Sequence, residues 1–68
     1  MEINAIQEIL HAMPFQPFSL HLADGRKFPI PHPDFLATYK RRVVYSNPKN
    51  SSWMVIEPLL IVSLDFEG

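Results

Sequence analysis

The side chains able to do acid–base or metal chemistry are few and widely spaced in this chain of 68 residues. The chain has three histidines, His11, His21 and His32, and no cysteine. Helical zinc sites use histidines four residues apart, and no two histidines here have that spacing. In a hairpin that turns at Asp24-Gly25, His21 would lie opposite positions near Pro29 and not opposite His32. We therefore expect no metal site, and we expect the ring of His32 to hold the turn after it by a hydrogen bond.

The two aspartates that could form a catalytic pair both stand in turn sequences. Asp24 precedes Gly25 and Asp34 follows His32-Pro33, so the sequence predicts structural turns made by Asp24, Gly25, His32, Pro33 and Asp34. No serine occupies a strand–turn–helix elbow, and the absence of a glycine-rich loop excludes a P-loop. A chain this short also has little room for a substrate pocket on the order of several hundred Å³. We predict that the protein is not an enzyme, with no catalytic residue and no cofactor.

Charge is distributed unevenly along the sequence. All six basic residues fall between positions 26 and 49, where Asp34 is the only acid, so this segment carries +5. The remaining six acidic residues give the rest of the chain −6. A basic face meeting an acidic face of another copy would be a heterologous contact, which closes into a ring or continues as a filament. The charge pattern therefore favours a homo-oligomer.

A cluster of cations and aromatic rings lies in the middle of the basic segment. We take it as the candidate nucleic-acid or partner-binding surface, comprising Tyr39, Lys40, Arg41, Arg42 and Tyr45. Positive charge combined with stacking suits single-stranded nucleic acid. The alternative is a solvated loop between two strands, and the sequence pI of about 6.2 lacks the basic character of a dedicated nucleic-acid binder. Nucleic acid is therefore a possible partner but not the favoured one.

The elements that would position these residues begin with a helix. Ile3, Ile6, Leu10 and Met13 recur at helical spacing, which predicts a helix over residues 1–13 that ends before Pro14. Five short strands are then predicted: alternating apolar residues indicate strands near 18–22, 27–31 and 61–66, a β-branched and aromatic run indicates one at 42–45, and another is expected at 53–56. The prolines at 29 and 31 cannot donate to a strand ladder, so they require an edge or a sharp bend. Residues 35–39 are expected to connect two strands.

This order of elements predicts a mainly β (α+β) fold in a single domain, residues 1–68. The expected architecture is an N-terminal helix, which forms a lid, followed by a five-stranded, strongly bent SH3-like or Sm-like small barrel over residues 18–66. Closure would remove the edges that an open sheet exposes. An open α+β sheet capped by the helix is the main alternative. Because so short a chain buries a small core, and because it has no disulfide, we expect closure, oligomerisation or both to supplement that core. The single tryptophan, Trp53, is expected in the core or at an interface.

Four stretches form a further pattern: PFQPF at 14–18, HLADGR at 21–26, HPDF at 32–35 and IVSL at 61–64. Together they resemble a group of short bacterial proteins that carry a domain of unknown function. The resemblance covers nearly the whole chain and implies a free-standing domain. It carries no functional residue over to this sequence.

Taken together, these features predict a non-enzymatic small interaction module that self-associates and binds an unidentified protein partner. The alternative function is an Sm-like protein that binds RNA or single-stranded DNA. No basic residue precedes an apolar run at the N-terminus, and no apolar stretch approaches the ~20 residues that span a bilayer. We therefore expect a cytoplasmic protein with no membrane partner.

Overall fold

A computed structural model describes residues 1–47 and 49–66. These residues form one helix, α1 (Ile3–Leu10), and six strands: β1 (Phe18–Leu22), β2 (Lys27–Ile30), β3 (Leu36–Tyr39), β4 (Arg42–Asn47), β5 (Ser52–Ile56) and β6 (Ile61–Phe66). Two short 3-10 turns, η1 (Pro33–Phe35) and η2 (Pro58–Leu60), lie between β2 and β3 and between β5 and β6. The expectation of a helix followed by a small, mainly β unit is confirmed.

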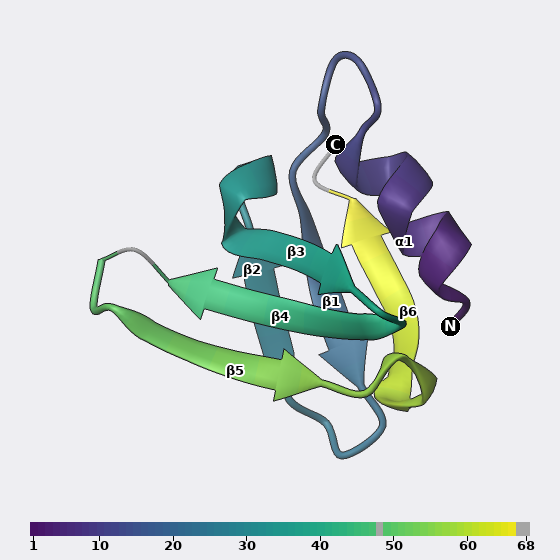
Figure 1. Cartoon of the computed structure of the whole chain (residues 1–68), viewed down its shortest axis with the longest axis vertical. Helices are drawn as coiled ribbons and strands as arrows, with labels where there is room; N and C mark the ends of the chain where they lie inside the picture. The colour runs from purple at the N-terminus through teal and green to yellow at the C-terminus, as the bar shows by residue number, and fades with distance from the viewer. Residues whose placement is uncertain (48, 67–68) are drawn as a thin grey trace.

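The strands form two antiparallel sheets of three. The first sheet has the order β2-β1-β6 and the second has the order β3-β4-β5. The strands of the second sheet cross in front of those of the first (Figure 1). Alternate residues of β1 point into the core, as the sequence pattern predicted: Phe18, Leu20 and Leu22 are all buried. The core also takes Ile30 of β2, Val43 of β4 and Ile61 of β6.

The strand count and the closure differ from the expectation. The segment expected to be a connector contains β3, which pairs with β4 from Leu36 opposite Tyr45 to Tyr39 opposite Arg42. Within the described residues no ladder joins the two sheets, so they form no closed barrel. Prolines explain where the first sheet ends. Pro31 and Pro33 lack the backbone N–H that a ladder requires, so the chain leaves the first sheet after Ile30 and enters the second at Leu36. The prolines left open an edge or a sharp bend for this strand, and β2 lies at the edge of its sheet.

The helix is shorter than the predicted 1–13. Ile6 and Leu10 are buried as the spacing predicted, but Met13 is 95% exposed and lies beyond the helix. The peptide bond between Met13 and Pro14 is cis. A residue before proline is disfavoured in helical conformation, so Met13 cannot continue the apolar stripe.

The helix contacts both sheets and therefore acts as the expected lid. At its start, the ammonium group of Met1 donates to the backbone oxygens of Pro58, at 2.8 Å, and Ile61, at 3.1 Å. In its middle, Gln7 Nε2 donates to Thr38 Oγ1 of β3 at 3.1 Å. Figure 1 shows α1 beside β6 and near the end of β3. Within the described residues, no helix is long and apolar enough to cross a membrane.

Candidate functional site

Four of the five residues of the predicted binding surface lie together at the tip of the β3–β4 hairpin. Tyr39 and Arg42 form the last pair of the ladder, and Lys40 and Arg41 are the two turn residues between them. Both turn residues have positive φ, 46° and 65°, which is the backbone of a type I′ turn. Tyr39 is 66% exposed, and Lys40 Nζ lies 5.3 Å from the centre of its ring. The tip therefore displays three cations beside an exposed aromatic ring.

Tyr45, the fifth predicted residue, does not belong to this tip. It lies opposite Leu36 at the far end of the ladder and is only 8% exposed. Its ring packs 5.0 Å from that of Phe28 and 6.4 Å from that of Phe35. Because side chains alternate along β4, Tyr45 follows Val43 into the core while Arg42 points outward. The proposed aromatic flank of the basic cluster is thus reduced to Tyr39.

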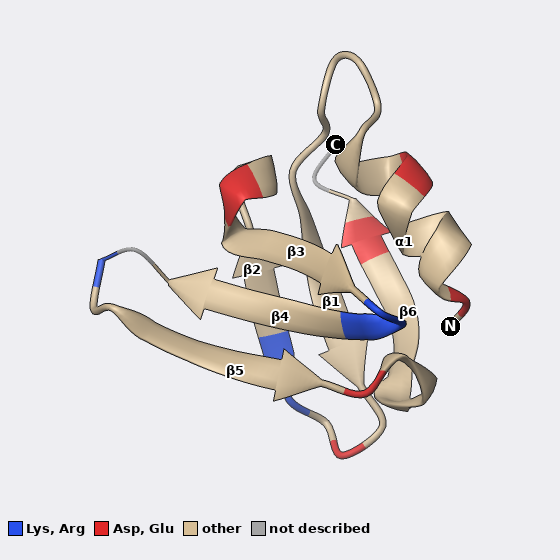
Figure 2. Cartoon of the chain, viewed as in Figure 1, with Lys and Arg blue, Asp and Glu red and all other residues tan. Residues whose placement is uncertain are grey.

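The other basic residues do not extend the hairpin tip into one face. Arg26 and Lys27 lie at the start of β2, and Lys49 lies beyond the opposite end of β4 from Arg42. Figure 2 shows the blue positions separated, with red acidic positions near the tip and near the β1–β2 turn. The charge separation along the sequence therefore does not become a basic face and an acidic face in the fold. Glu67, one of the acids in the expected pattern, lies outside the described residues.

The predicted turn at Asp24-Gly25 is present, with a longer loop than a two-residue hairpin. Asp24 Oδ1 accepts a hydrogen bond from the backbone N–H of Arg26 at 3.0 Å, and Gly25 has a φ of 92°, which favours glycine. The same N–H lowers the pKa of the Asp24 carboxyl group, and the guanidinium of Arg26, 2.7 Å from Oδ2, lowers it further. These are the contacts of a turn-forming aspartate.

The turn formed by His32, Pro33 and Asp34 is present, but the expected role of the histidine ring is wrong. The backbone N–H of Phe35 donates to the His32 carbonyl at 3.1 Å, and His32 makes no side-chain capping bond. Its ring lies 6.3 Å from that of Phe35. The proline at the first position of η1 already sets the backbone for the turn, so the ring is not required to hold it.

His21 lies on the outer face of the first sheet, opposite Lys27 on β2 and Ser63 on β6, and not opposite a position near Pro29. Its Nε2 is 2.9 Å from Asp65 Oδ2, an ion pair only when the imidazole is protonated. The imidazole of His21 and the carboxylate of Asp65 are not oriented for a hydrogen bond. Among the residues that the structure describes, no three His, Cys, Asp or Glu side chains are grouped closely enough to hold a metal ion.

Exposed apolar residues are concentrated on β5, η2 and β6, and we call this set of residues the β5–β6 surface. Six of the eight large exposed apolar residues belong to it: Trp53, Val55, Leu59, Leu60, Val62 and Phe66. Trp53 is 70% exposed and Leu59 is 80% exposed. A core position for Trp53 is therefore wrong. Alternation along β5 explains this placement, because Met54 and Ile56 turn inward and direct Trp53 and Val55 outward. Because residues 53–56 are all apolar, the sequence alone does not show which of them face solvent.

The four sheet edges differ in how they are protected. On β2, Pro29 has no backbone donor, and neither has Pro31, which directly follows the strand. The helix α1 lies next to β3 and β6. Gln7 of α1 binds Thr38 on β3, and Met1, just before the helix, binds the carbonyl of Ile61 on β6. By contrast, β5 pairs only with β4 among the described strands, and its sequence SWMVI holds no proline and no charge. Edge strands are normally blocked by charges, prolines or a covering segment, and in the part of the chain that the structure describes none of these blocks β5.

A scan against protein families, a search of curated proteins and a search of solved structures found no match to this chain.

Proposed function

We propose that the protein is a non-enzymatic interaction module that associates with a second copy of itself through β5 and the adjoining β5–β6 surface. The observation that carries this proposal is the unprotected, uncharged edge of β5, from which Trp53 and Val55 project into solvent. A second strand placed on this edge satisfies its free backbone N–H and C=O groups. It also removes exposed aromatic and β-branched side chains from water.

We take the partner to be a second copy because β5 is itself an uncharged edge strand, which is what pairing with another β5 requires. Its residues 52–56 are uncharged, so two copies of the strand side by side bring no like charges into contact. The six exposed apolar residues of the β5–β6 surface all fall between positions 53 and 66, on β5 and the segments that follow it. A small domain without disulfides gains stability from such a contact. An unidentified protein that offers an edge strand of its own would use the same surface.

The arrangement of the two sheets supports a finer proposal, that the fold is an SH3-like or Sm-like small barrel left open at one seam. Strands β2 and β3 are separated by η1 and the two residues before it, so they act as two halves of one bent strand that passes from the first sheet to the second. The strand order then runs β6-β1-β2 and continues β3-β4-β5. The open seam lies between β5 and β6, and these two strands together with η2 between them carry six of the eight large exposed apolar residues.

The mass of the protein in solution tests self-association. We expect light scattering at micromolar concentration to give at least twice the chain mass of 7.9 kDa. A dimer fits pairing of β5 with β5, and a larger closed ring fits pairing of β5 with β6 of the next copy. Val55→Lys, which places a charge on the free edge, should yield a folded monomer. Ala37→Lys adds the same charge to exposed β3 and should leave the mass unchanged. A wild-type monomer that stays folded would overturn the proposal.

A second function, binding of RNA or single-stranded DNA, is favoured by one observation at the β3–β4 tip. Lys40 and Arg41 occupy positive-φ positions that Asn-Gly would fill with less strain, and they present their charges beside the exposed ring of Tyr39. Binding of mixed-sequence oligonucleotides should weaken steeply as salt increases, because the contacts are to phosphates. No binding at about 50 mM salt would exclude this function for the tip.

A further inference from the structure

A pocket opens between β2, η1 and the end of β4, away from the β5–β6 surface. It has a volume of about 470 Å³ and is lined by Pro29, Pro31, His32, Phe35, Tyr45, Asn47 and Lys49. We call it the proline–aromatic pocket. Its volume falls in the range of about 300–1,000 Å³ that is usual for small-molecule sites. The function proposed above does not use it.

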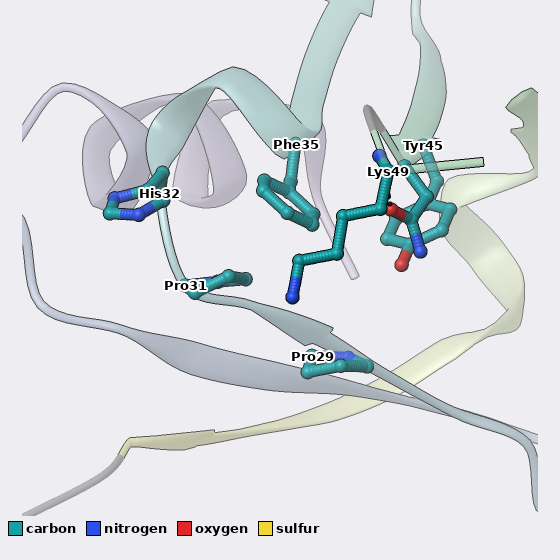
Figure 3. A pocket seen from close by; sticks show the side chains of 7 residues that line it. Pro29, Pro31, His32, Phe35, Tyr45 and Lys49 are labelled. Carbon is teal, nitrogen blue, oxygen red and sulfur yellow. Dashed lines mark hydrogen bonds between the residues drawn. The ribbon is translucent and has the colours of Figure 1, made fainter. Parts of the chain in front are cut away.

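Aromatic and proline rings form most of the walls of this pocket. Phe35 and Tyr45 are buried from behind by the core, and a further ring, that of Phe28, packs against Tyr45. Pro29 and Pro31 lie on the opposite side (Figure 3). Aromatic and proline rings are rigid, so little side-chain entropy is lost when a planar apolar body enters between them. The walls therefore suit an aromatic ring.

The polar groups of the pocket are mainly donors. Figure 3 shows the Lys49 side chain extending across the space between Phe35 and the two prolines. Its ammonium group forms no ion pair with any described acidic residue. The Asn47 side-chain oxygen already accepts the backbone N–H of Lys49 at 3.0 Å, which leaves its NH₂ group as a donor. No Asp or Glu among the described residues lines the pocket. The complementary ligand thus has an anionic, acceptor-only end.

An extended peptide does not suit this site. A peptide held along β2 would need backbone donors from its outer edge, and Pro29 and Pro31 have none to offer. A compact ligand needs no such ladder. We propose that the proline–aromatic pocket binds a small aromatic carboxylate, with its ring between the prolines and the Phe35–Tyr45 pair and its carboxylate at Lys49.

The test uses 3-phenylpropionate and its uncharged amide, 3-phenylpropionamide, titrated into the full chain and followed by NMR. We expect the acid to bind about tenfold more tightly than the amide, because a charge-assisted hydrogen bond is lost with the amide. Lys49→Met should remove this preference and leave the melting temperature unchanged. Lys27→Met, which removes a lysine outside the pocket, should keep it.

Three results would overturn the proposal. One is equal affinity for acid and amide, and another is retention of the preference in Lys49→Met. The third is that the NMR signals of Phe35, Tyr45 and Asn47 do not shift when the ligand is added. A short peptide ending in phenylalanine serves as a separate arm of the experiment. If that peptide binds the pocket and 3-phenylpropionate does not, the site belongs to peptides and the small-molecule assignment is wrong. Because Lys49 lies outside β5, a failure here leaves the mass measurements on Val55→Lys unaffected.

Discussion

The side-chain amide of Gln7 donates a hydrogen bond to the hydroxyl of Thr38 at 3.1 Å and so fastens the middle of α1 to the edge of the second sheet. The start of α1 is fastened elsewhere, because the ammonium of Met1 binds the carbonyls of Pro58 and Ile61. One helix of eight residues thus contacts strands of both sheets. A helix this short is marginal by itself, so these tertiary contacts account for its stability.

Removal of the Gln7–Thr38 bond should destabilise the protein by about 1 kcal/mol. Gln7→Ala and Thr38→Val each delete one partner, and in a double-mutant cycle we expect a coupling free energy of about 0.5–1.5 kcal/mol from denaturant unfolding. Additive effects of the two substitutions would show that the bond does not contribute to stability.

Two apolar residues of the predicted helical stripe should respond very differently to truncation. Ile6 is fully buried, so Ile6→Ala should cost about 2–5 kcal/mol, enough to unfold much of a domain this small. Met13 is almost fully exposed, and Met13→Ala should change the free energy of unfolding by less than about 0.5 kcal/mol. Chemical denaturation of the two variants measures both changes in the free energy of unfolding. Similar costs at both sites would contradict the described end of α1 at Leu10.

Replacement of the hairpin tip by Asn-Gly should stabilise the protein. Lys40 and Arg41 both adopt left-handed backbone conformations, which cost side-chain-bearing residues free energy that glycine and asparagine largely avoid. We expect Lys40→Asn combined with Arg41→Gly to raise the free energy of unfolding by about 1 kcal/mol. The same double variant should lose oligonucleotide binding if the tip is a nucleic-acid surface. Unchanged or lower stability would argue against the type I′ turn.

The carboxyl group of Asp24 should titrate below the ordinary aspartate pKa of about 4. The backbone N–H of Arg26 is the main cause, so the fold favours the ionised carboxylate. Because the pKa of Asp24 is lower in the folded state than in the unfolded state, the ionised carboxylate stabilises the fold at pH values above the ordinary, unfolded-state pKa. That stabilisation is lost as the pH falls through the lower, folded-state pKa. NMR titration of Asp24 measures this directly. In Arg26→Ala the pKa should rise only part of the way, because the backbone donor remains, and a full return would assign the effect to the guanidinium.

Local patterns in the sequence were sufficient for several elements. The alternation of Phe18, Leu20 and Leu22 identified β1, and the prolines at 29 and 31 identified β2 as an edge. Asp24-Gly25 identified the turn between these strands. Each of these features depends on backbone chemistry or on side-chain period within a few residues, so no distant contact is needed to predict it.

Other features were decided by contacts between distant residues. Residues 36–39 form a strand because β4 supplies the matching hydrogen-bond partners, and nothing within those four residues requires it. The six basic residues, which share one segment of the sequence, are separated by the geometry of the β2 start, the β3–β4 tip and the β4–β5 loop. The side chain of Tyr45 lies in the core and not in the basic cluster, because alternate residues of β4 point inward.

The amino-acid sequence by itself therefore determined a small α+β chain with an amphipathic helix, short strands and sharply placed turns. Only the tertiary structure decided that the strands divide into two sheets, that β5 is the unprotected edge, and that rings from three separate segments line one pocket. The physical reason is that periodicity and turn chemistry act over a few residues. The pairing of strands and the exposure of an edge depend on which distant segments satisfy each other's backbone groups.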